Sequence, residues 1–326
     1  EQDIHQIILA GARAFSTAGM GPGDIVFNCM NYCMWMGGFT DQQSMEAAGA
    51  TAVPYGVGNT ENLIHALLDI NVACVHSTPS YLSIIKKVLA EKFGKVPRDL
   101  CLKKGFFGGE SGMQNVSFRQ RIESEWGMVA MDANYGLSEV VSILGAECLQ
   151  RQGLHFTSSD ILAVELVSFE DGNISSRSIG AGQEGELTIT HLKKEAQPLL
   201  RYRTGDMIKI LSTDPCACGE ASFRFQVVGR FDDMLVVRGI NFFPESVRAI
   251  LTEFPEYEGN FLVRAPKTDP IMEIQIIVQV KPGNTLPSIS ARIREEIREK
   301  LFITPGIELV EHLPIHGNKA KLVERV

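Results

Sequence analysis

The segment GMVAMDANYGLSEVV, residues 127–141, begins as an apolar run with strand character and then turns polar. Its second half, from residue 132, sets five polar, aromatic or small residues between apolar ones: Asn134, Tyr135, Gly136, Ser138 and Glu139. A carboxylate in such company needs either water or a cation. The segment therefore predicts a strand that gives way to a polar site. The alternative is a helix N-terminus capped by Ser138.

Around this segment, short apolar runs alternate with stretches of helical spacing. Apolar residues recur with helical spacing over residues 60–70 and 79–94. The strand-like runs lie at residues 24–31, 50–55, 72–77, 102–109 and 127–136. This alternation predicts an α/β fold with a largely parallel sheet.

The pattern changes twice further along the chain. From about residue 155 one strand pattern follows another, for example DILAVELVSF and QEGELTITHL. After GRFDD, a small β/α/β/β/α/β pattern predicts an α+β unit of ferredoxin-like kind. We therefore expect a large domain over residues 1–230 and a small domain over residues 231–326, an organisation that agrees with a length of 326 residues.

The overall composition excludes several classes of protein. Of the residues, 44% are apolar and 21% charged, and no apolar run approaches the roughly 18 residues of a membrane helix. The chain carries 39 acidic and 31 basic residues, a net charge of -8, without a basic block. This balance argues against nucleic acid as a partner. We expect no membrane association.

The seven cysteines are an odd number spread over a long chain, which predicts thiols in a reducing compartment and hence a cytoplasmic protein. Two of them, Cys216 and Cys218, form a Cys-x-Cys pair in CACG. Such a pair often supplies two of the four ligands of a zinc site. The nearest upstream soft donors are Cys148 and His155, and the alternative is that all four are unpaired structural residues. The remaining cysteines lie among apolar neighbours, where we expect buried thiols: Cys29, Cys33, Cys74 and Cys101.

Further short motifs carry chemistry only in combination. FFGGES at 106–111 would let backbone approach a flat ligand at Gly109, although alone it is a turn. LLRYRTGDM places Asp206 at a glycine-permitted turn at the end of a strand, where it could bind two ribose hydroxyls. Arg230 stands at the domain junction, and Lys319 lies on a glycine-bearing loop near the C-terminus, where a solvated lysine is the plain alternative.

In this order and spacing, GGES, YGLSE, RYRTGD, GRFDDMLVVRGINFFP and GNKAK resemble the core motifs of the adenylate-forming ligases. MDANYGLSE, LLRYRTGD and RGINFFPESV are most similar to the phenylacetate-coenzyme A ligase branch, and the resemblance covers nearly the whole chain. It implies a large adenylate-forming domain of mixed sheets and helices with a mobile C-terminal domain. It also implies the substrates ATP, a carboxylic acid and coenzyme A, with AMP as a product.

The resemblance assigns roles to individual residues. Tyr135 would stack on adenine, with Asn134 and Gly136 beside it. Ser138 would bind the α-phosphate, and Glu139 would hold magnesium, because a carboxylate attacking a phosphate needs a cation to offset the repulsion of the two anions. The other nucleotide contacts would come from Gly109, Glu110, Asp206 and Arg230.

The C-terminal motifs receive roles in the same way. Lys319 would stabilise the adenylation transition state, Asp232 would be the hinge between two half-reactions, and Gly239 would border the pantetheine tunnel. Members of this branch often carry a zinc site, which strengthens the assignment of Cys148, His155, Cys216 and Cys218 as zinc ligands.

Two features depart from the family pattern. No Ser/Thr/Gly-rich loop followed by Lys, the family's triphosphate cradle, occurs in the sequence. We therefore expect that the chain lacks an N-terminal portion with this loop and is inactive alone. In addition, GGESGM replaces the branch's usual Ala-Glu-Pro-Trp, and Tyr55 and Val57 stand where small residues are usual, so the acyl pocket differs.

Three functions follow from these residues. The first is an acid-thiol ligase that makes an aryl-CoA or arylacetyl-CoA. The second is an adenylating enzyme whose acceptor is an amine or a carrier protein. The third is a zinc-stabilised nucleotide-binding module without activity. Homodimer formation is a further expectation.

Overall fold

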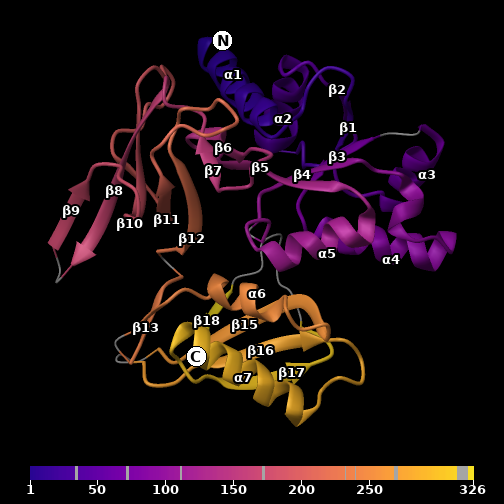
Figure 1. The fold of residues 1–326 in the computed structure, drawn as a ribbon, viewed down its shortest axis with the longest axis vertical. Helices are drawn as coiled ribbons and strands as arrows, with labels where there is room; N and C mark the ends of the chain where they lie inside the picture. The colour runs from indigo at the N-terminus through magenta and orange to yellow at the C-terminus, as the bar shows by residue number, and fades with distance from the viewer. Residues whose placement is uncertain are drawn as a thin grey trace. The chain divides into compact units, whose positions relative to one another are not determined.

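The structure is a computed structural model that describes residues 1–33, 36–70, 73–110, 112–170, 173–231, 233–238, 240–267, 271–313 and 322–326 (Figure 1). The chain forms two compact units. The N-terminal unit comprises residues 1–204 and 208–227, and the C-terminal unit comprises residues 205–207 and 228–326.

The first half of the N-terminal unit alternates strands and helices, as the sequence predicts. Its five strands, all parallel, lie in the order β2-β1-β3-β4-β5. They are β1 (Ile25–Asn28), β2 (Thr51–Pro54), β3 (Cys74–Ser77), β4 (Lys104–Gly108) and β5 (Val129–Leu137). The helices are α1 (Gln2–Thr17), α2 (Met36–Ala47), α3 (Thr60–Ile70), α4 (Tyr81–Phe93), the 3-10 helix η1 (Pro97–Leu100) and α5 (Val116–Trp126).

Helices cover both faces of this parallel region (Figure 1). Successive residues of a strand point to opposite faces, and Phe106 and Phe107 of β4 accordingly belong to different apolar cores. Phe106 packs with Phe15 of α1 on one side. Phe107 lies in the core that Trp126 of α5 and Ile85 of α4 complete on the other side. This double burial explains why these strands read as continuous apolar runs.

The same sheet continues in the order β5-β6-β7-β12-β11-β10-β8-β9, and its pairs β5–β6, β6–β7, β7–β12, β10–β8 and β8–β9 are antiparallel. These strands are β6 (Val141–Glu147), β7 (Leu154–Phe156), β8 (Leu162–Glu170), β9 (Asn173–Arg177), β10 (Glu184–His191), β11 (Tyr202–Ser212) and β12 (Arg224–Arg230). The α/β fold class is thus confirmed, and the strand-rich texture after residue 155 corresponds to the antiparallel half.

The segment around residue 136 follows the predicted strand and not the alternative of a helix N-terminus. Strand β5 runs on through Asn134 and Tyr135 to Leu137 and joins β6 by a tight turn, so Ser138 does not cap a helix. Gly136 permits this continuation, because a Cβ at this position would overlap the carbonyl group of Ser142 in β6. The polar residues therefore belong to a hairpin.

The C-terminal unit contains a hairpin and a four-stranded sheet with two helices. The hairpin is β13 (Leu235–Val237) and β14 (Ile240–Phe242), and the other elements are α6 (Glu245–Leu251), β15 (Tyr257–Ala265), β16 (Gln275–Val280), α7 (Pro287–Leu301), β17 (Gly306–Val310) and β18 (Val323–Arg325). The sheet order is β17-β16-β15-β18. The expected ferredoxin-like arrangement is not confirmed, because the strand before α6 pairs within its own hairpin and β18 pairs with β15 in parallel.

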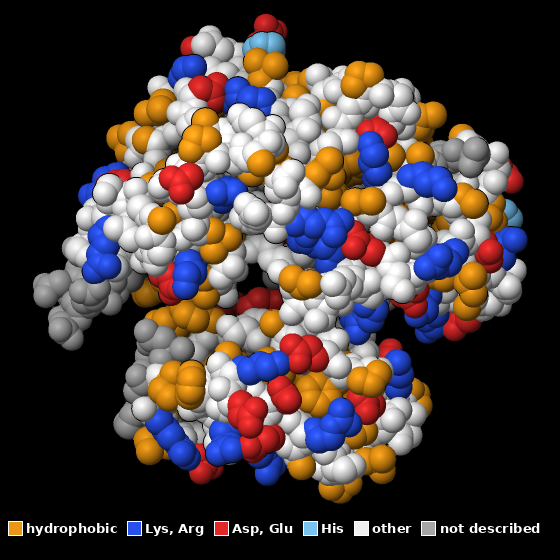
Figure 2. Space-filling model, in the orientation of Figure 1, with side chains coloured by type: hydrophobic (Ala, Val, Ile, Leu, Met, Phe, Trp, Pro, Cys, Tyr) orange, Lys and Arg blue, Asp and Glu red, His pale blue; other side chains and the backbone are white. Residues whose placement is uncertain are grey.

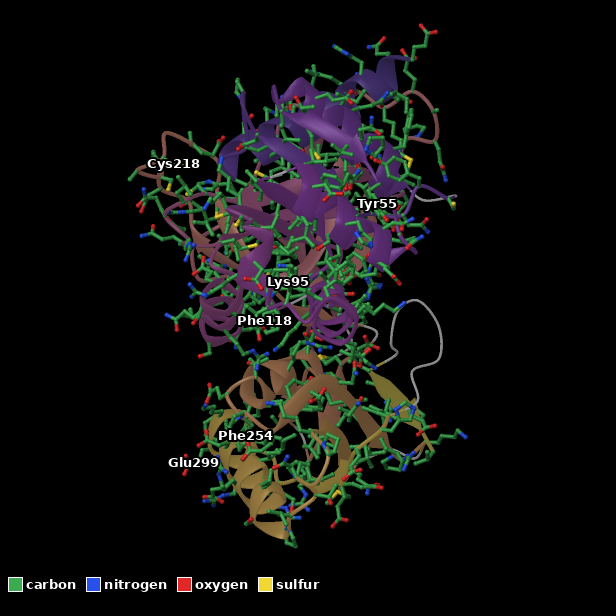
Figure 3. The ribbon with its side chains drawn as sticks, turned by 90° about the vertical axis from the view of Figure 1, so that its right-hand side faces the viewer. Tyr55, Lys95, Phe118, Cys218, Phe254 and Glu299 are labelled. Atoms are coloured by element: carbon green, nitrogen blue, oxygen red, sulfur yellow. The ribbon has the colours of Figure 1, made fainter. Side chains whose placement is uncertain are left out.

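Helix α7 packs an apolar face into the core of this unit. Ile289, Ile293 and Ile297 recur every four residues and are buried in the core of this unit. Glu299 points away from that core (Figure 3), and basic and acidic side chains alternate over the outer face of the helix (Figure 2). No helix in the described part of the chain combines the length and apolar character that a bilayer crossing requires.

Candidate functional site

The predicted nucleotide-binding residues of the N-terminal unit lie at the carboxyl ends of adjacent strands. Gly109 and Glu110 directly follow β4, and Tyr135 lies near the end of its parallel neighbour β5. In open α/β sheets, ligands bind outside the carboxyl ends of the strands. Tyr55, which follows β2, belongs to the same edge of the sheet and is labelled in Figure 3.

Gly109 and Glu110 form a fixed corner at this edge. Gly109 has a φ of +74°, in the left-handed region that glycine adopts without strain. The Glu110 carboxylate accepts hydrogen bonds from the Ser80 hydroxyl at 2.7 Å and from the Ser80 amide at 3.1 Å. Since Ser80 precedes α4, the carboxylate ties the end of β4 to the start of that helix.

Asn134 points into a buried polar network instead of the open edge. Its amide nitrogen donates to Asp41 Oδ2 at 2.7 Å. His76 Nδ1 lies 2.8 Å from the carbonyl oxygen of Phe106 and therefore carries a hydrogen. His76 Nε2 lies 3.1 Å from Asp41 Oδ2 and 3.4 Å from Asn134 Nδ2. Burial raises the pKa of Asp41.

Tyr135, Ser138 and Glu139 are presented by the hairpin of β5 and β6. The Tyr135 ring is half-buried and meets Phe225 edge-on, with 5.4 Å between ring centroids. Ser138 and Glu139 lie exposed in the turn, where the Glu139 carboxylate accepts a hydrogen bond of 2.8 Å from the Tyr202 hydroxyl. An aromatic ring, a hydroxyl and a carboxylate thus come from one hairpin.

Asp206 and Arg230 form an ion pair in the C-terminal unit. Arg230 Nη1 donates to Asp206 Oδ1 at 3.0 Å. Asp206 lies inside β11 and is buried, whereas the sequence predicts it at the end of a strand. The preceding Gly205 has a φ of +77°, and a Cβ there would come within 2.5 Å of Arg230 Nη2. Glycine is thus needed for the pair.

A Cys/His cluster in the N-terminal unit joins the β6–β7 segment to the turn between β11 and β12. Its four ligand atoms lie within 4.8 Å of one another: those of Cys148, His155, Cys216 and Cys218. Cys148 follows β6, His155 lies in β7, and the two other cysteines belong to the turn at residues 216–219. Figure 3 shows Cys218 at the edge of this unit.

The distances in this cluster fit a tetrahedral metal site. Cys148 Sγ lies 3.8 Å from Cys216 Sγ, and Cys218 Sγ lies 3.6 Å from His155 Nε2. Tetrahedral zinc with Zn–S of about 2.3 Å and Zn–N of about 2.0–2.1 Å separates its ligands by about 3.8 and 3.6 Å. A disulfide would need about 2.05 Å. Burial lowers the pKa of His155, which favours the neutral imidazole that a metal requires.

The remaining cysteines only partly follow the prediction. Cys29 and Cys74 are buried thiols, as expected. Cys33 and Cys101 are exposed, so the prediction was wrong for them. Cys101 ends η1 in a left-handed conformation with a φ of 56°, and local apolar neighbours did not reveal this turn.

Comparison with known proteins identifies the family. The chain is 33% identical over 323 residues to the phenylacetate-coenzyme A ligase of Thermus thermophilus, covering 92% of this chain and 70% of that protein. It is 30% identical to the phenylacetate-coenzyme A ligase of Aromatoleum evansii, covering 99% of this chain and 74% of that protein. The chain belongs to the phenylacetate-coenzyme A ligase family. The resemblance drawn from its motifs is thereby confirmed, and the protein is a ligase.

Two further comparisons agree with this family. The family model described as the AMP-binding enzyme C-terminal domain matches residues 239–326. A solved 2-hydroxyisobutyryl-CoA ligase in complex with R3-HIB-AMP superposes with a TM-score of 0.87 and 26% identity, covering 99% of this chain and 70% of that chain. The fold is therefore that of a CoA ligase described in complex with an acyl-adenylate.

Three residues that this family would use fall outside the described part of the chain. They are the expected hinge residue Asp232, the expected tunnel residue Gly239 and the expected catalytic lysine Lys319. Their roles stay predictions.

Sequence reasoning missed a second buried polar cluster in this ligase. Asp132 Oδ2 accepts from Gln114 Nε2 at 3.1 Å, while Arg119 Nη2 donates to Glu147 Oε2 at 2.9 Å. Burial and the nearby Glu147 charge raise the pKa of Asp132 to about 7. The acid in MDANYG was a visible signal, but its neighbours come from separate elements that spacing does not bring together.

Proposed function

We propose that this ligase joins a small aryl or arylacetic acid to coenzyme A through an acyl-adenylate formed from ATP. The observation that carries the proposal is the placement of Gly109, Glu110, Tyr135 and Glu139 at the carboxyl ends of β4 and β5 in a chain of this family. The relatives named above, which are phenylacetate-coenzyme A ligases, support both the acid class and the acceptor.

The reaction has two steps. A carboxylate oxygen attacks the α-phosphorus of ATP, and the bond from that phosphorus to pyrophosphate breaks. The thiol sulfur of coenzyme A then attacks the acyl carbonyl, AMP leaves with the bridging oxygen, and the thiol proton is released. The first step brings two anions together, so cationic groups must offset the repulsion.

In the N-terminal unit, Tyr135 offers its ring to adenine and Ser138 its hydroxyl to the α-phosphate. Glu139 would hold magnesium, for which an exposed carboxylate is a suitable ligand. When bound, magnesium would neutralise phosphate charge as pyrophosphate leaves. Gly109 and Glu110 would border the adenine.

Asn134 and Gly136 support the nucleotide site from within the sheet. The Asn134 side chain is bound to Asp41, and Gly136 allows β5 and β6 to approach. Both residues would therefore act by fixing the strand that carries Tyr135.

Residues of the C-terminal unit also receive proposed roles. The carboxylate of Asp206 would accept hydrogen bonds from the ribose hydroxyls while its contact with Arg230 holds it in place. Within a C-terminal domain at residues 231–326, Lys319 would stabilise adenylation, Asp232 would act as the hinge, and Gly239 would leave room for pantetheine. These last three roles rest on the motifs.

The Cys/His cluster supports a structural zinc site. Three sulfurs and one imidazole form a closed ligand set, because all four positions of a tetrahedral zinc would be filled by protein. Zinc would fasten the turn at 216–219 to the β6–β7 hairpin and would take no part in the reaction. The expected homodimer and cytoplasmic location stay predictions.

Calorimetry with acyl-sulfamoyl-adenosines, stable analogues of acyl-adenylates, tests this function. The phenylacetyl analogue should bind at least 100-fold more tightly than AMP, as intermediates commonly do, and more tightly than the hexanoyl analogue. Asp206→Ala should weaken both AMP and the analogues. Equal affinity for AMP and every acyl analogue would contradict an acyl-adenylate site.

A further inference from the structure

Side chains from one segment hold the turn that carries Glu139. The turn joins β5 to β6 and is closed by a hydrogen bond of 3.0 Å from the Val140 amide to the Leu137 carbonyl. The segment at residues 191–202, between β10 and the start of β11, contacts this turn at several points. A two-stranded turn on its own would leave an exposed glutamate free to rotate.

Tyr202 acts on the carboxylate itself. Its hydroxyl donates to Glu139 Oε1 at 2.8 Å. Within the ranges that the structure describes, this is the only hydrogen bond to the Glu139 carboxylate, so Oε2 remains available to a cation. Because a phenol is neutral, it orients the carboxylate without cancelling its charge. An arginine here would compete with a bound cation.

Lys194 and His191 act on the backbone of the same turn. Lys194 Nζ donates to the Glu139 carbonyl oxygen at 2.9 Å. The Leu199 amide donates to His191 Nδ1 at 3.0 Å, so His191 Nε2 carries the hydrogen that it donates to the Val140 carbonyl at 3.1 Å. Both side chains therefore fix the turn through main-chain oxygens.

Asp3, in the first turn of α1, anchors residues 195 and 196 of this segment. The Asp3 carboxylate accepts hydrogen bonds from the amides of Glu195 at 2.9 Å and Ala196 at 2.8 Å. Lys194 is adjacent to these amides. The chain of contacts thus runs from α1 through residues 194–196 to the carbonyl of Glu139.

We propose that Tyr202 and Lys194 are positioning residues that hold Glu139 in the orientation in which it binds the divalent cation of the nucleotide. Tyr202 sets the carboxylate, and Lys194 sets the main chain beneath it. The inference rests on the proposed function of Glu139 as a magnesium ligand. It adds that cation affinity depends on two residues that touch neither cation nor nucleotide.

The test measures the dissociation constant of Mn²⁺, which substitutes for magnesium. It uses electron paramagnetic resonance of the natural-length protein saturated with α,β-methylene-ATP. Tyr202→Phe should raise the Mn²⁺ dissociation constant about tenfold, since it removes one hydrogen bond to a charged group. Lys194→Met should also raise it through the lost position of the turn, although the removal of a positive charge near Glu139 opposes this effect. Affinity for AMP without metal should not change, and the melting temperature of Tyr202→Phe should match the wild type.

Matched controls separate this effect from general disturbance. Lys209→Met removes a surface lysine that pairs with Glu184 at 2.9 Å, and Tyr257→Phe removes a hydroxyl from the C-terminal unit. Both should leave Mn²⁺ affinity unchanged. In a Glu139→Gln background, Tyr202→Phe should have no further effect, because the partner carboxylate is gone.

The outcomes distinguish the inference from the function on which it rests. If Glu139→Gln weakens Mn²⁺ binding and Tyr202→Phe does not, the positioning role is wrong while Glu139 remains the ligand. If Glu139→Gln leaves Mn²⁺ affinity intact, the assignment of Glu139 as a ligand fails, and the positioning role fails with it.

Discussion

Asp41 and His76 form a fully buried pair, and Asn134 of β5 is bound to the same carboxylate. Removal of one partner of a buried pair leaves the other without compensation. Asp41→Ala should therefore lower the free energy of unfolding by about 3–5 kcal/mol in urea titrations. Asp160→Ala, which breaks the exposed pair with Arg13, is the control and should cost less than about 1 kcal/mol. Similar small losses in both variants would show that the network does not support the strand.

Asp132 should make the free energy of unfolding fall as pH rises toward 7. Its pKa is raised from 3.8 to about 7 by burial and by the charge of Glu147, so the folded state binds more protons than the unfolded state between these values. Stability from this group is present at low pH and is lost as pH rises toward 7, at up to about 1.4 kcal/mol per pH unit. Asp132→Asn should remove this slope.

The measurement is the difference in unfolding free energy between wild type and Asp132→Asn from pH 4.5 to pH 7.5. The difference isolates Asp132 from the other acids. The variant should gain stability relative to the wild type as pH rises. A constant difference across the range would mean that Asp132 is already ionised at the low end.

Among the structural elements, the turn at residues 216–219 is too short to hold its own position. We expect its two cysteines to be tied to β6 and β7 by zinc, with about one zinc per chain in metal analysis. Cys216→Ser should release the metal and lower the melting temperature by about 6–12 °C, the equivalent of roughly 3 kcal/mol for a domain of this size. Cys101→Ser, at an exposed cysteine outside the cluster, should change neither quantity. Purified protein without metal and with wild-type stability would contradict the zinc site.

The sequence predicted elements better than the contacts between them. Alternating patterns predicted the parallel strands, because double burial makes each of them an apolar run. The sequence did not reveal what holds the polar Asn134 side chain inside its predicted strand, because the partner is distant in the sequence. That partner, Asp41, lies 93 positions away on α2. The ferredoxin-like assignment is not confirmed, and local patterns do not state that β18 pairs with β15.

The Cys/His cluster, in contrast, is a contact between distant segments that the sequence did predict. Its four residues were predicted as a group, because soft ligands are few and the chemistry of zinc restricts the choice. The motifs singled out Asp206 and Arg230 as nucleotide contacts but did not predict the ion pair between them. The positioning contacts of Tyr202 and Lys194 were not, because a phenol or an amine bonded to a turn leaves no pattern in the sequence.

At the scale of the whole molecule, the two half-reactions should respond to different variants. Lys319→Ala should reduce acid-dependent pyrophosphate exchange of the natural-length protein by a factor equivalent to about 3–4 kcal/mol, the usual loss of a transition-state donor. Thioester formation from supplied acyl-adenylate should survive. Asp232→Pro, which restricts the expected hinge, should do the reverse. Equal loss of both steps in both variants would exclude a C-terminal domain that serves them separately.

Adenylate formation is tested most directly by following the oxygen atoms of the acid. The natural-length protein is supplied with ATP, magnesium, coenzyme A and phenylacetate labelled with ¹⁸O in its carboxylate, and the products are analysed by mass spectrometry. If the carboxylate attacks the α-phosphorus, each AMP formed carries a single ¹⁸O and appears together with phenylacetyl-CoA. ADP as the product, with ¹⁸O in inorganic phosphate, would contradict adenylate formation and with it the function proposed for this protein.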